Sequence, residues 1–391
     1  MHTILQLPFK LMTLTGIWMP KEFTSQYEKQ GWTLYSIASI TLMAIQSLTL
    51  SITLILSENS EQFFETLFIV PTGLQNLQKI YVVVAHRKKL MDLEKMFSND
   101  YCIPRNVEEL LIQRKYDENI RILTLSCIIL MNLTVANLIA SPLFDAYFTT
   151  MNTRTLPMRI WLPYKMDLNI IFWLTFIQQS VGVIFVGYCI ISTTLMINGF
   201  MYHVCCQFRI LSCRFKKLPQ VIDYFRSLKK PYNVIYQYER RAIKQNVQHH
   251  LCIFRIAENI NDTFKSVIFQ QFCISSIVVS ASIFQLSTRQ EIDMEFFMVL
   301  FYLICVLVDF YIYSWFGNQL MLESLNFQRS IYEIDWTTLS TNAGKDLVFI
   351  MMRASKPILM YCGHFVVLSL ESYVGILKVS YSVLNLFRRS K

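Results

Sequence analysis

Charged side chains are scarce in this sequence. Of its 391 residues, 16% are charged and 53% are hydrophobic, whereas soluble domains carry about 25% charged residues. The shortage is concentrated in long apolar runs rather than spread along the chain. This pattern excludes one or two soluble globular domains and indicates a polytopic membrane protein.

Glycine and proline are also few, at 10 residues each. The apolar runs are rich in Leu, Ile, Phe, Ser and Thr, which suits helices, and they lack the alternating segments of about ten residues that form a transmembrane barrel. No linker or low-complexity stretch divides the chain. We therefore expect an all-α fold that forms a single domain over residues 1–391.

Seven apolar runs are long enough to cross a bilayer, which requires about 20 residues. The predicted transmembrane helices span residues 34–56, 63–85, 122–144, 168–200, 266–286, 296–322 and 358–387. Residues 1–33 show no strong apolar core followed by a small-residue cleavage site. We therefore expect them to form a cytoplasmic segment rather than a cleaved signal.

The distribution of Lys and Arg predicts on which side of the membrane each loop lies. Segments 1–33, 86–121, 201–265 and 323–357 hold 27 of the 36 basic residues, and the segments on the opposite side hold 7. Because basic residues favour the cytoplasmic side, we expect a cytoplasmic N-terminus and an extracellular C-terminus, the reverse of a G-protein-coupled receptor. The net charge of +9 then reflects membrane topology, and membrane lipids rather than nucleic acid are the expected surroundings.

Two of the predicted cytoplasmic segments, 201–265 and 323–357, are long and helical in pattern. The 41 residues between Asp167 and Arg209 contain no charge, and such a stretch is far longer than one bilayer crossing. We expect the fourth and sixth helices to continue past the membrane and to pack there in a cytoplasmic helical layer. These two segments are called the anchor segments below.

No motif for enzymatic chemistry is present. The sequence lacks HExxH, GxSxG, P-loop and GxGxxG patterns, so we expect neither an enzyme nor a cofactor. Cys205, Cys206 and Cys213 lie near His203, but their spacing does not match paired zinc ligands and the cytoplasm is reducing. This group is therefore expected to serve packing rather than metal binding.

A few ionisable residues stand at unusual positions. Lys79 lies near the inner end of the second predicted span, where its side chain is expected to reach the membrane surface. Asp309 lies in the inner half of the sixth span and either pairs with a neighbouring helix or marks where its own helix leaves the bilayer. His249 and His250 are expected on a solvated helix face.

The last predicted helix is more polar than lipid would favour. Lys378 is about ten residues, or about 15 Å of helix, before Arg388, too far to reach the membrane surface cheaply. A stripe at helical spacing combines a small residue, a hydroxyl, a bulky apolar residue and a terminal charge: Gly375, Val379, Ser382, Leu386 and Arg389. Both a water-filled pathway with one hydrophobic constriction and helix packing with serine hydrogen bonds fit this stripe.

The C-terminal stretch SKPILMYCGHFVVLSLESYVGILKVSYSVLNLF resembles the signature of insect odorant receptors, which reads approximately KPxxxxxGxFxxLSLxx(F/Y)xxILKxSYS. The stretch YSWFGNQLMLESLNFQRSIYEIDW resembles the exit of the family's sixth helix, and LPYKMD before the fourth span is similar as well. The matching signature positions are Lys356, Pro357, Gly363, Phe365, Leu368, Ser369, Leu370, Tyr373, Ile376, Leu377, Lys378, Ser380, Tyr381 and Ser382.

The resemblance implies an odorant-gated, non-selective cation channel subunit in the plasma membrane of an olfactory neuron's dendrite. Such receptors form heterotetramers with a shared odorant-receptor coreceptor, and the last helices of four subunits surround one pore. It also implies that Leu386 forms the hydrophobic gate, that Val379 and Ser382 line the pore, and that Asn385 and Arg389 lie beside the gate. An arginine near a cation pore departs from what such a pore would favour.

In the family, a small volatile odorant binds in the outer half of each subunit, between the second, third, fourth and sixth helices. The residues that this implies combine aromatic rings and Met with a few polar groups, which suits a largely apolar ligand. The implied odorant-binding residues are Phe68, Thr72, Gln75, Val135, Ile139, Phe172, Phe176, Gln179, Phe297, Met298 and Phe301.

Three rival classes remain. A gustatory receptor of the same superfamily usually ends in a Thr-Tyr…Gln-Phe signature, and Ser380-Tyr381-Ser382 takes that place here. A G-protein-coupled receptor would show Asp-Arg-Tyr and Asn-Pro-x-x-Tyr motifs, which are absent. A seven-helix transporter would favour paired carboxylates at mid-membrane, and the intramembrane acids Glu65, Asp309 and Glu371 show no evident pairing in the sequence.

Overall fold

The computed structural model describes residues 5–20, 25–57, 63, 66–67, 69–148, 156–158, 160–164, 168–288, 294–363 and 365–389. Only the backbone is described for residues 143–148, 288, 294–295 and 383–389. The described chain is mostly helical, as its composition predicted.

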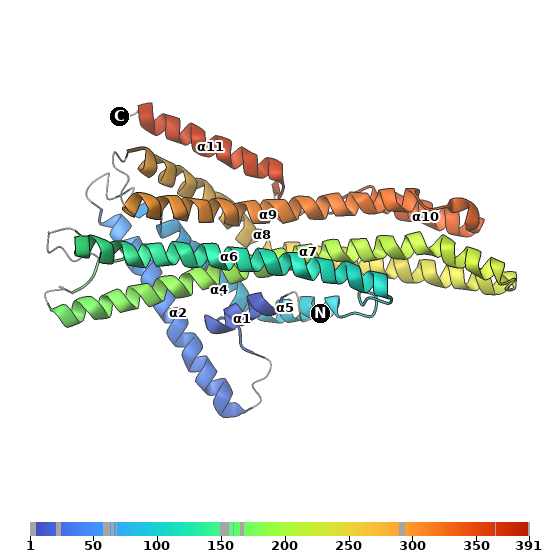
Figure 1. Ribbon diagram of the computed structural model, residues 1–391, viewed down its shortest axis with the longest axis horizontal. Helices are drawn as coiled ribbons and strands as arrows, with labels where there is room; N and C mark the ends of the chain where they lie inside the picture. The colour runs from blue at the N-terminus through green and yellow to red at the C-terminus, as the bar shows by residue number, and fades with distance from the viewer. Residues whose placement is uncertain are drawn as a thin grey trace.

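Four long helices form the body of the protein: α6 (Val107–Phe148), α7 (Asn169–Ser227), α8 (Tyr232–Thr288) and α9 (Met294–Tyr332). They run along the long axis of the molecule, and α7 packs against the other three (Figure 1). The 59 residues of α7 extend over roughly 90 Å, about three times the hydrocarbon thickness of a bilayer. The predicted continuation of the fourth and sixth helices beyond one bilayer thickness is therefore confirmed, and the fifth helix is continuous with its anchor segment as well.

The N-terminal part forms shorter helices: α1 (Gln6–Leu14), α2 (Gln26–Ile55), α4 (Val70–Ala85) and α5 (Arg87–Phe97). A capping box starts α2, because the Ser25 backbone N–H donates to Glu28 Oε2 over 3.2 Å. Further along, α2 approaches α4 at Gly73, whose carbonyl accepts from Ser47 Oγ over 3.2 Å. A Cβ on Gly73 would lie only 3.2 Å from that oxygen, so glycine permits this close helix contact.

Within the described residues, five helices are long and apolar enough to cross a membrane, judged by length and composition: α2, α6, α7, α8 and α9. The second and seventh predicted spans coincide with shorter or more polar helices. Helix α4 has 16 residues, about 24 Å, which is less than the hydrocarbon core of about 30 Å. Within the predicted span 63–85, helix α4 begins at Val70. Several residues between 63 and 70 lie outside the described part of the chain.

The prediction of a helix over residues 358–387 is wrong in its first third. Tyr361–Cys362 (β1) and Val366–Val367 (β2) form an antiparallel hairpin, and the last helix, α11, is Leu370–Arg389. Gly363 turns the chain with a φ of +63°, a conformation that glycine adopts without strain. The Gly363 N–H donates to the Lys265 carbonyl over 2.9 Å, so the hairpin is tied to α8 before α11 begins.

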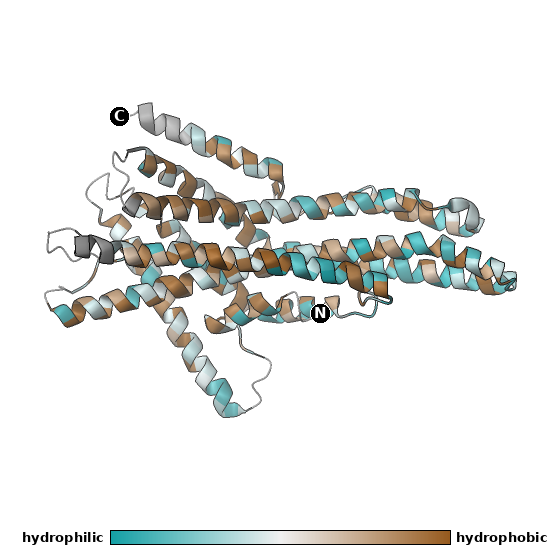
Figure 2. Cartoon of the chain, in the orientation of Figure 1, coloured by the Kyte–Doolittle hydropathy of each residue, from teal (hydrophilic) through white to brown (hydrophobic). Residues whose placement is uncertain are grey.

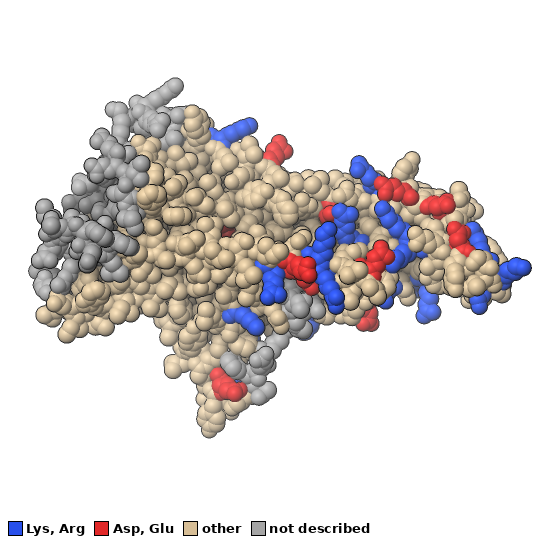
Figure 3. Space-filling view, viewed as in Figure 1, with Lys and Arg blue, Asp and Glu red and all other residues tan. Residues whose placement is uncertain are grey.

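The anchor segments form the narrow end of the molecule. They consist of residues 201–227 of α7, residues 232–265 of α8, residues 323–332 of α9, a short 3-10 turn at Trp336–Thr338 and α10 (Thr341–Ala354). Hydrophilic residues concentrate at this end (Figure 2), and most of the charged side chains visible in Figure 3 lie there. Inside, Phe208, Phe215 and Phe327 are fully buried, so a charged surface encloses an aromatic core.

His249 and His250 were expected on a solvated face, and this prediction is wrong, because they are 0% and 4% exposed. His249 Nδ1 lies 3.0 Å from Arg214 Nη1, and His249 Nε2 lies 2.9 Å from Gln207 Oε1. Since a guanidinium only donates, Nδ1 accepts and Nε2 donates. Arg214 is in turn held by the Glu109 carboxylate at 2.8 Å, so three helices meet in one buried polar network.

Candidate functional site

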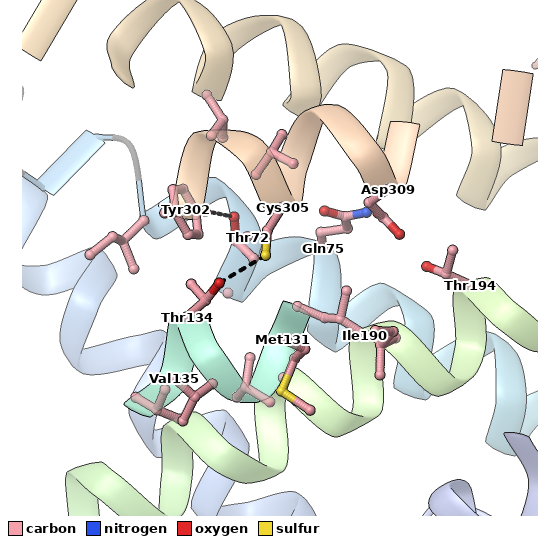
Figure 4. A pocket seen from close by; sticks show the side chains of 18 of the residues that line it. Thr72, Gln75, Met131, Thr134, Val135, Ile190, Thr194, Tyr302, Cys305 and Asp309 are labelled. Atoms are coloured by element: carbon pink, nitrogen blue, oxygen red, sulfur yellow. Dashed lines mark hydrogen bonds between the residues drawn. The ribbon is translucent and has the colours of Figure 1, made fainter. Parts of the chain in front are cut away.

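An internal cavity of about 190 Å³ lies between α2, α4, α6, α7, α8 and α9. Its walls are almost entirely apolar, with Leu, Ile, Val and Met side chains from each long helix. Figure 4 shows Met131, Val135 and Ile190 along one side and Tyr302, Cys305 and Asp309 along the other. Because pockets for drug-sized ligands measure about 300–1,000 Å³, this cavity suits a smaller molecule.

Four of the predicted odorant-binding residues line this cavity: Thr72 and Gln75 from α4, Val135 from α6 and Met298 from α9. Their role as ligand contacts stays a prediction.

The other predicted residues do not line it. Phe172, Phe176 and Gln179 are buried near the start of α7, whereas α7 lines the cavity from Val183 to Leu195. Phe297 is 40% exposed, and Ile139 and Phe301 lie outside the lining as well. Phe68 lies outside the described residues. The lining contributed by α7 therefore lies about three to four helical turns further along this helix than the sequence suggested.

Two helices contribute lining residues that were not predicted from the sequence. Gln46 and Ser47 come from α2, and Gln271 and Ser275 come from α8. The only sequence signal for them is their polarity within an apolar span, and that signal is shared by many residues that serve helix packing.

Polar groups in the cavity walls are paired with one another across helices. Gln75 donates to Gln271, which donates to Ser275 Oγ over 3.0 Å. The Thr72 hydroxyl is hydrogen-bonded to the Tyr302 hydroxyl. One helical turn further along α9, Cys305 Sγ lies 3.0 Å from Thr134 Oγ1 of α6. These pairs fix the helices around the cavity and satisfy much of its hydrogen-bonding capacity.

An ion pair stands at one end of the cavity. Lys79 is fully buried, and its Nζ donates to Thr194 Oγ1 over 3.0 Å and lies 3.9 Å from Asp309 Oδ2. The Tyr313 hydroxyl also lies within 3.4 Å of Thr194 Oγ1. The expectation that Lys79 reaches the membrane surface is therefore wrong, because its partners lie inside the helix bundle. Of the two alternatives for Asp309, the structure shows pairing with a neighbouring helix.

The predicted pore residues lie on α11. Its buried side presents Ile376 and Ser380 to the body, and Ser380 Oγ approaches the Ser276 carbonyl at 3.4 Å. Val379 is 54% exposed, and Ser382 is exposed with its Oγ donating to the Lys378 carbonyl over 3.0 Å. The side chains of Asn385, Leu386 and Arg389 lie outside the described part, although their backbone continues the helix.

Comparison with known proteins places this geometry in a family. The model of the 7tm odorant receptor family matches residues 59–381. Odorant receptor 13a of Drosophila melanogaster is 22% identical over 96% of this chain and 93% of its own length. Odorant receptor Or1 of Anopheles gambiae is 23% identical over 64% of this chain and 63% of its own length.

A solved structure shares the fold. The olfactory receptor OR5 of Machilis hrabei, determined in complex with eugenol, superimposes with a TM-score of 0.84 at 16% identity. The match covers 99% of this chain and 98% of that receptor. Together with the extent of the family match, these findings establish that the chain belongs to the 7tm odorant receptor family.

Proposed function

We propose that this protein is an odorant-gated, non-selective cation channel subunit that acts with a shared odorant-receptor coreceptor. The observation that carries the proposal is the apolar cavity between the helices of a chain that belongs to the odorant receptor family. A small, volatile, largely apolar molecule suits its walls, since dispersion contacts and burial stabilise such a ligand.

The proposed arrangement in the membrane has seven spans within one domain, a cytoplasmic N-terminus and an extracellular C-terminus. The distribution of basic residues supports it, as does the concentration of charged side chains around the anchor segments (Figure 3). The plasma membrane of an olfactory neuron is the proposed location. In this arrangement the anchor segments lie in the cytoplasm and the cavity lies within the membrane.

Helix α9 offers a route from the cavity to the proposed pore helix. Its residues Tyr302 and Asp309 line the cavity. One residue later, the Phe310 ring lies 5.4 Å from the Tyr373 ring of α11, measured between centroids. An odorant that binds the open state more tightly would shift the closed–open equilibrium, and a shift of α9 would move α11 through this contact.

The test is whole-cell current in cells that express this chain with and without an insect odorant-receptor coreceptor, during a panel of volatiles. We expect odour-evoked cation current only when both proteins are present. Current from this chain alone would contradict the requirement for a coreceptor. Absence of current in both conditions, with surface expression confirmed by labelling and a broad panel applied, would contradict the channel proposal.

A further inference from the structure

The Asp309 carboxylate is a strong hydrogen-bond acceptor that the protein uses only in part. Its one ion-pair partner in the described chain is Lys79 Nζ at 3.9 Å, which is longer than the 2.7–3.2 Å of a hydrogen bond. The side chain is 19% exposed and lines the cavity. A carboxylate offers about four acceptor sites, so Asp309 presents acceptor capacity to whatever fills the cavity.

The cation beside it is out of reach of a ligand. Lys79 is fully buried and does not line the cavity. Its Nζ instead donates to Thr194 Oγ1, which also lies within hydrogen-bond distance of Tyr313. A ligand at this end therefore meets the carboxylate and the Thr194 hydroxyl, but not the ammonium group. Among the described residues that line the cavity, Asp309 is the one charged group, and a hydrogen bond to a charged acceptor is stronger than one to a neutral acceptor.

Most other polar groups in the walls are paired with one another, and Gln46 Oε1, which has no hydrogen-bond partner among the described residues, adds a neutral acceptor. Gln75 bonds to Gln271, Thr72 to Tyr302 and Thr134 to Cys305. These amide and hydroxyl groups satisfy one another, whereas the charged acceptor at the end remains available.

The charge of the pair selects against ionic ligands. Lys79 and Asp309 together are neutral, so a protonated amine would bring an uncompensated positive charge into an apolar cavity. An ionised acid would place a second negative charge beside Asp309. Both arrangements are costly, because a buried charge without its own partner loses hydration that the protein does not replace. A neutral hydrogen-bond donor meets neither cost.

We infer that the cavity selects volatile alcohols and phenols, whose hydroxyl donates to the Asp309 carboxylate while the hydrocarbon part fills the apolar walls. This inference rests on the proposed function, because it names the ligand class of the same cavity. Ethers, esters and ketones of the same size lack the donor and would leave the carboxylate without a partner on that side.

Isomer pairs test the inference without changing ligand size. Hexanol and methyl pentyl ether are isomers, as are cresol and anisole, and each pair differs in whether a hydroxyl donor is present. Since a hydrogen bond to a charged group contributes roughly ten- to a hundredfold in affinity, we expect half-maximal responses at concentrations at least about tenfold lower for the hydroxyl isomer. The measurements are evoked current with the coreceptor and the thermal stabilisation of the purified protein by each isomer.

Two variants examine the role of Asp309. Asp309→Asn keeps the shape and removes the charged acceptor, but it leaves Lys79 without its anion. The double variant Lys79→Gln with Asp309→Asn removes both charges, so it contains no buried unpaired lysine that could cause misfolding. In both variants we expect the preference for the hydroxyl isomer to shrink to within a few-fold. Met131→Leu, an apolar change in the wall, serves as the control and should shift both isomers together.

The outcomes separate this inference from the proposed function. Ethers as potent as alcohols in the unmodified protein, or an alcohol preference that persists in the double variant, would overturn the inference while leaving an odorant-gated channel in place. Selective thermal stabilisation by alcohols without any evoked current would support the inference and count against the channel. Equal thermal stabilisation by both isomers, or stabilisation by neither, would show that the cavity does not bind the alcohol preferentially and would overturn the inference.

Discussion

At the scale of single residues, the anchor segments depend on histidines that are buried in the neutral form. His250 lies in the part of α8 outside its predicted membrane span, with its ring 4.7 Å from Phe254 and 4.8 Å from Phe327 between centroids. Burial, reinforced by the positive charge of Arg353, lowers the pKa of His250 from 6.5 to about 4. Burial lowers the pKa of His203 as well, to about 3.

A loss of stability on acidification follows. The unfolded chain binds a proton at His250 below about pH 6.5, whereas the folded chain does so only below about pH 4. The contribution of neutral His250 to the free energy of unfolding is therefore fully present above about pH 6.5 and is lost as the pH falls towards 4. At about 1.4 kcal/mol per pKa unit, the loss from His250 is on the order of 3 kcal/mol. We expect the thermal unfolding temperature of the purified protein to fall over this range, and the fall to be smaller in His250→Leu.

A packing change provides the control for this prediction. Phe254→Leu alters the same aromatic cluster without removing a titratable group, so it should lower the unfolding temperature at every pH and leave the slope unchanged. The His250→Leu variant should retain part of the slope, because His203 is also neutral when buried. An identical slope in the unmodified protein and in His250→Leu would show that His250 does not contribute to the acid sensitivity.

At the scale of elements, the hairpin before α11 sits directly on α9. A Cβ added at Gly317 of α9 would lie 2.6 Å from the Leu368 carbonyl oxygen, which is a backbone atom and cannot rotate away. Leu368 is itself fixed, because its N–H donates to the Met360 carbonyl over 2.8 Å. The junction between α9 and the start of α11 therefore requires a glycine at position 317.

Gly317→Ala is accordingly expected to destabilise this junction by about 1–3 kcal/mol, the usual range for overpacking, and to reduce odour-evoked current. Ligand-induced thermal stabilisation should persist, because Gly317 does not line the cavity. Gly344→Ala in α10 is the matched control, since a Cβ there meets nothing within 4 Å and alanine favours a helix. Full current with Gly317→Ala would exclude this junction from the coupling between α9 and α11.

The elements differ in how far the sequence could predict them. The charge-free stretch between Asp167 and Arg209 correctly predicted a helix longer than one bilayer thickness, because the continuity of a helix depends on its local sequence. The depth of the cavity was not predictable, since it depends on how helices slide past one another and not on the period of any one helix. Pairing of Asp309 with a neighbouring helix was one of two alternatives, but its partner Lys79 was not identified. The two residues are 230 positions apart in the sequence, and no pattern within either helix indicates that they meet.

At the scale of the whole molecule, the chain by itself leaves the outer side of α11 uncovered. Helix α11 packs on α8 and α9, while Val379 and Tyr381 remain 54% and 63% exposed. The exposed side also carries Lys378 and Ser382, a mixture of apolar and polar groups that neither lipid nor water alone favours. In the proposed tetramer this side would meet the pore and the neighbouring subunits.

The proposed gate gives the prediction for this assembly. Leu386 lies on the same helical stripe as Val379 and Ser382, and in the proposed channel a ring that includes its side chain closes the pore by excluding water. We expect Leu386→Ser, expressed with the coreceptor, to produce a several-fold rise in cation current before any odorant is applied. Leu384→Ser is the control, because two residues along a helix place Leu384 on nearly the opposite side. If basal and evoked currents both stay unchanged in Leu386→Ser, this residue does not form the gate, and the constriction must lie at another level of α11.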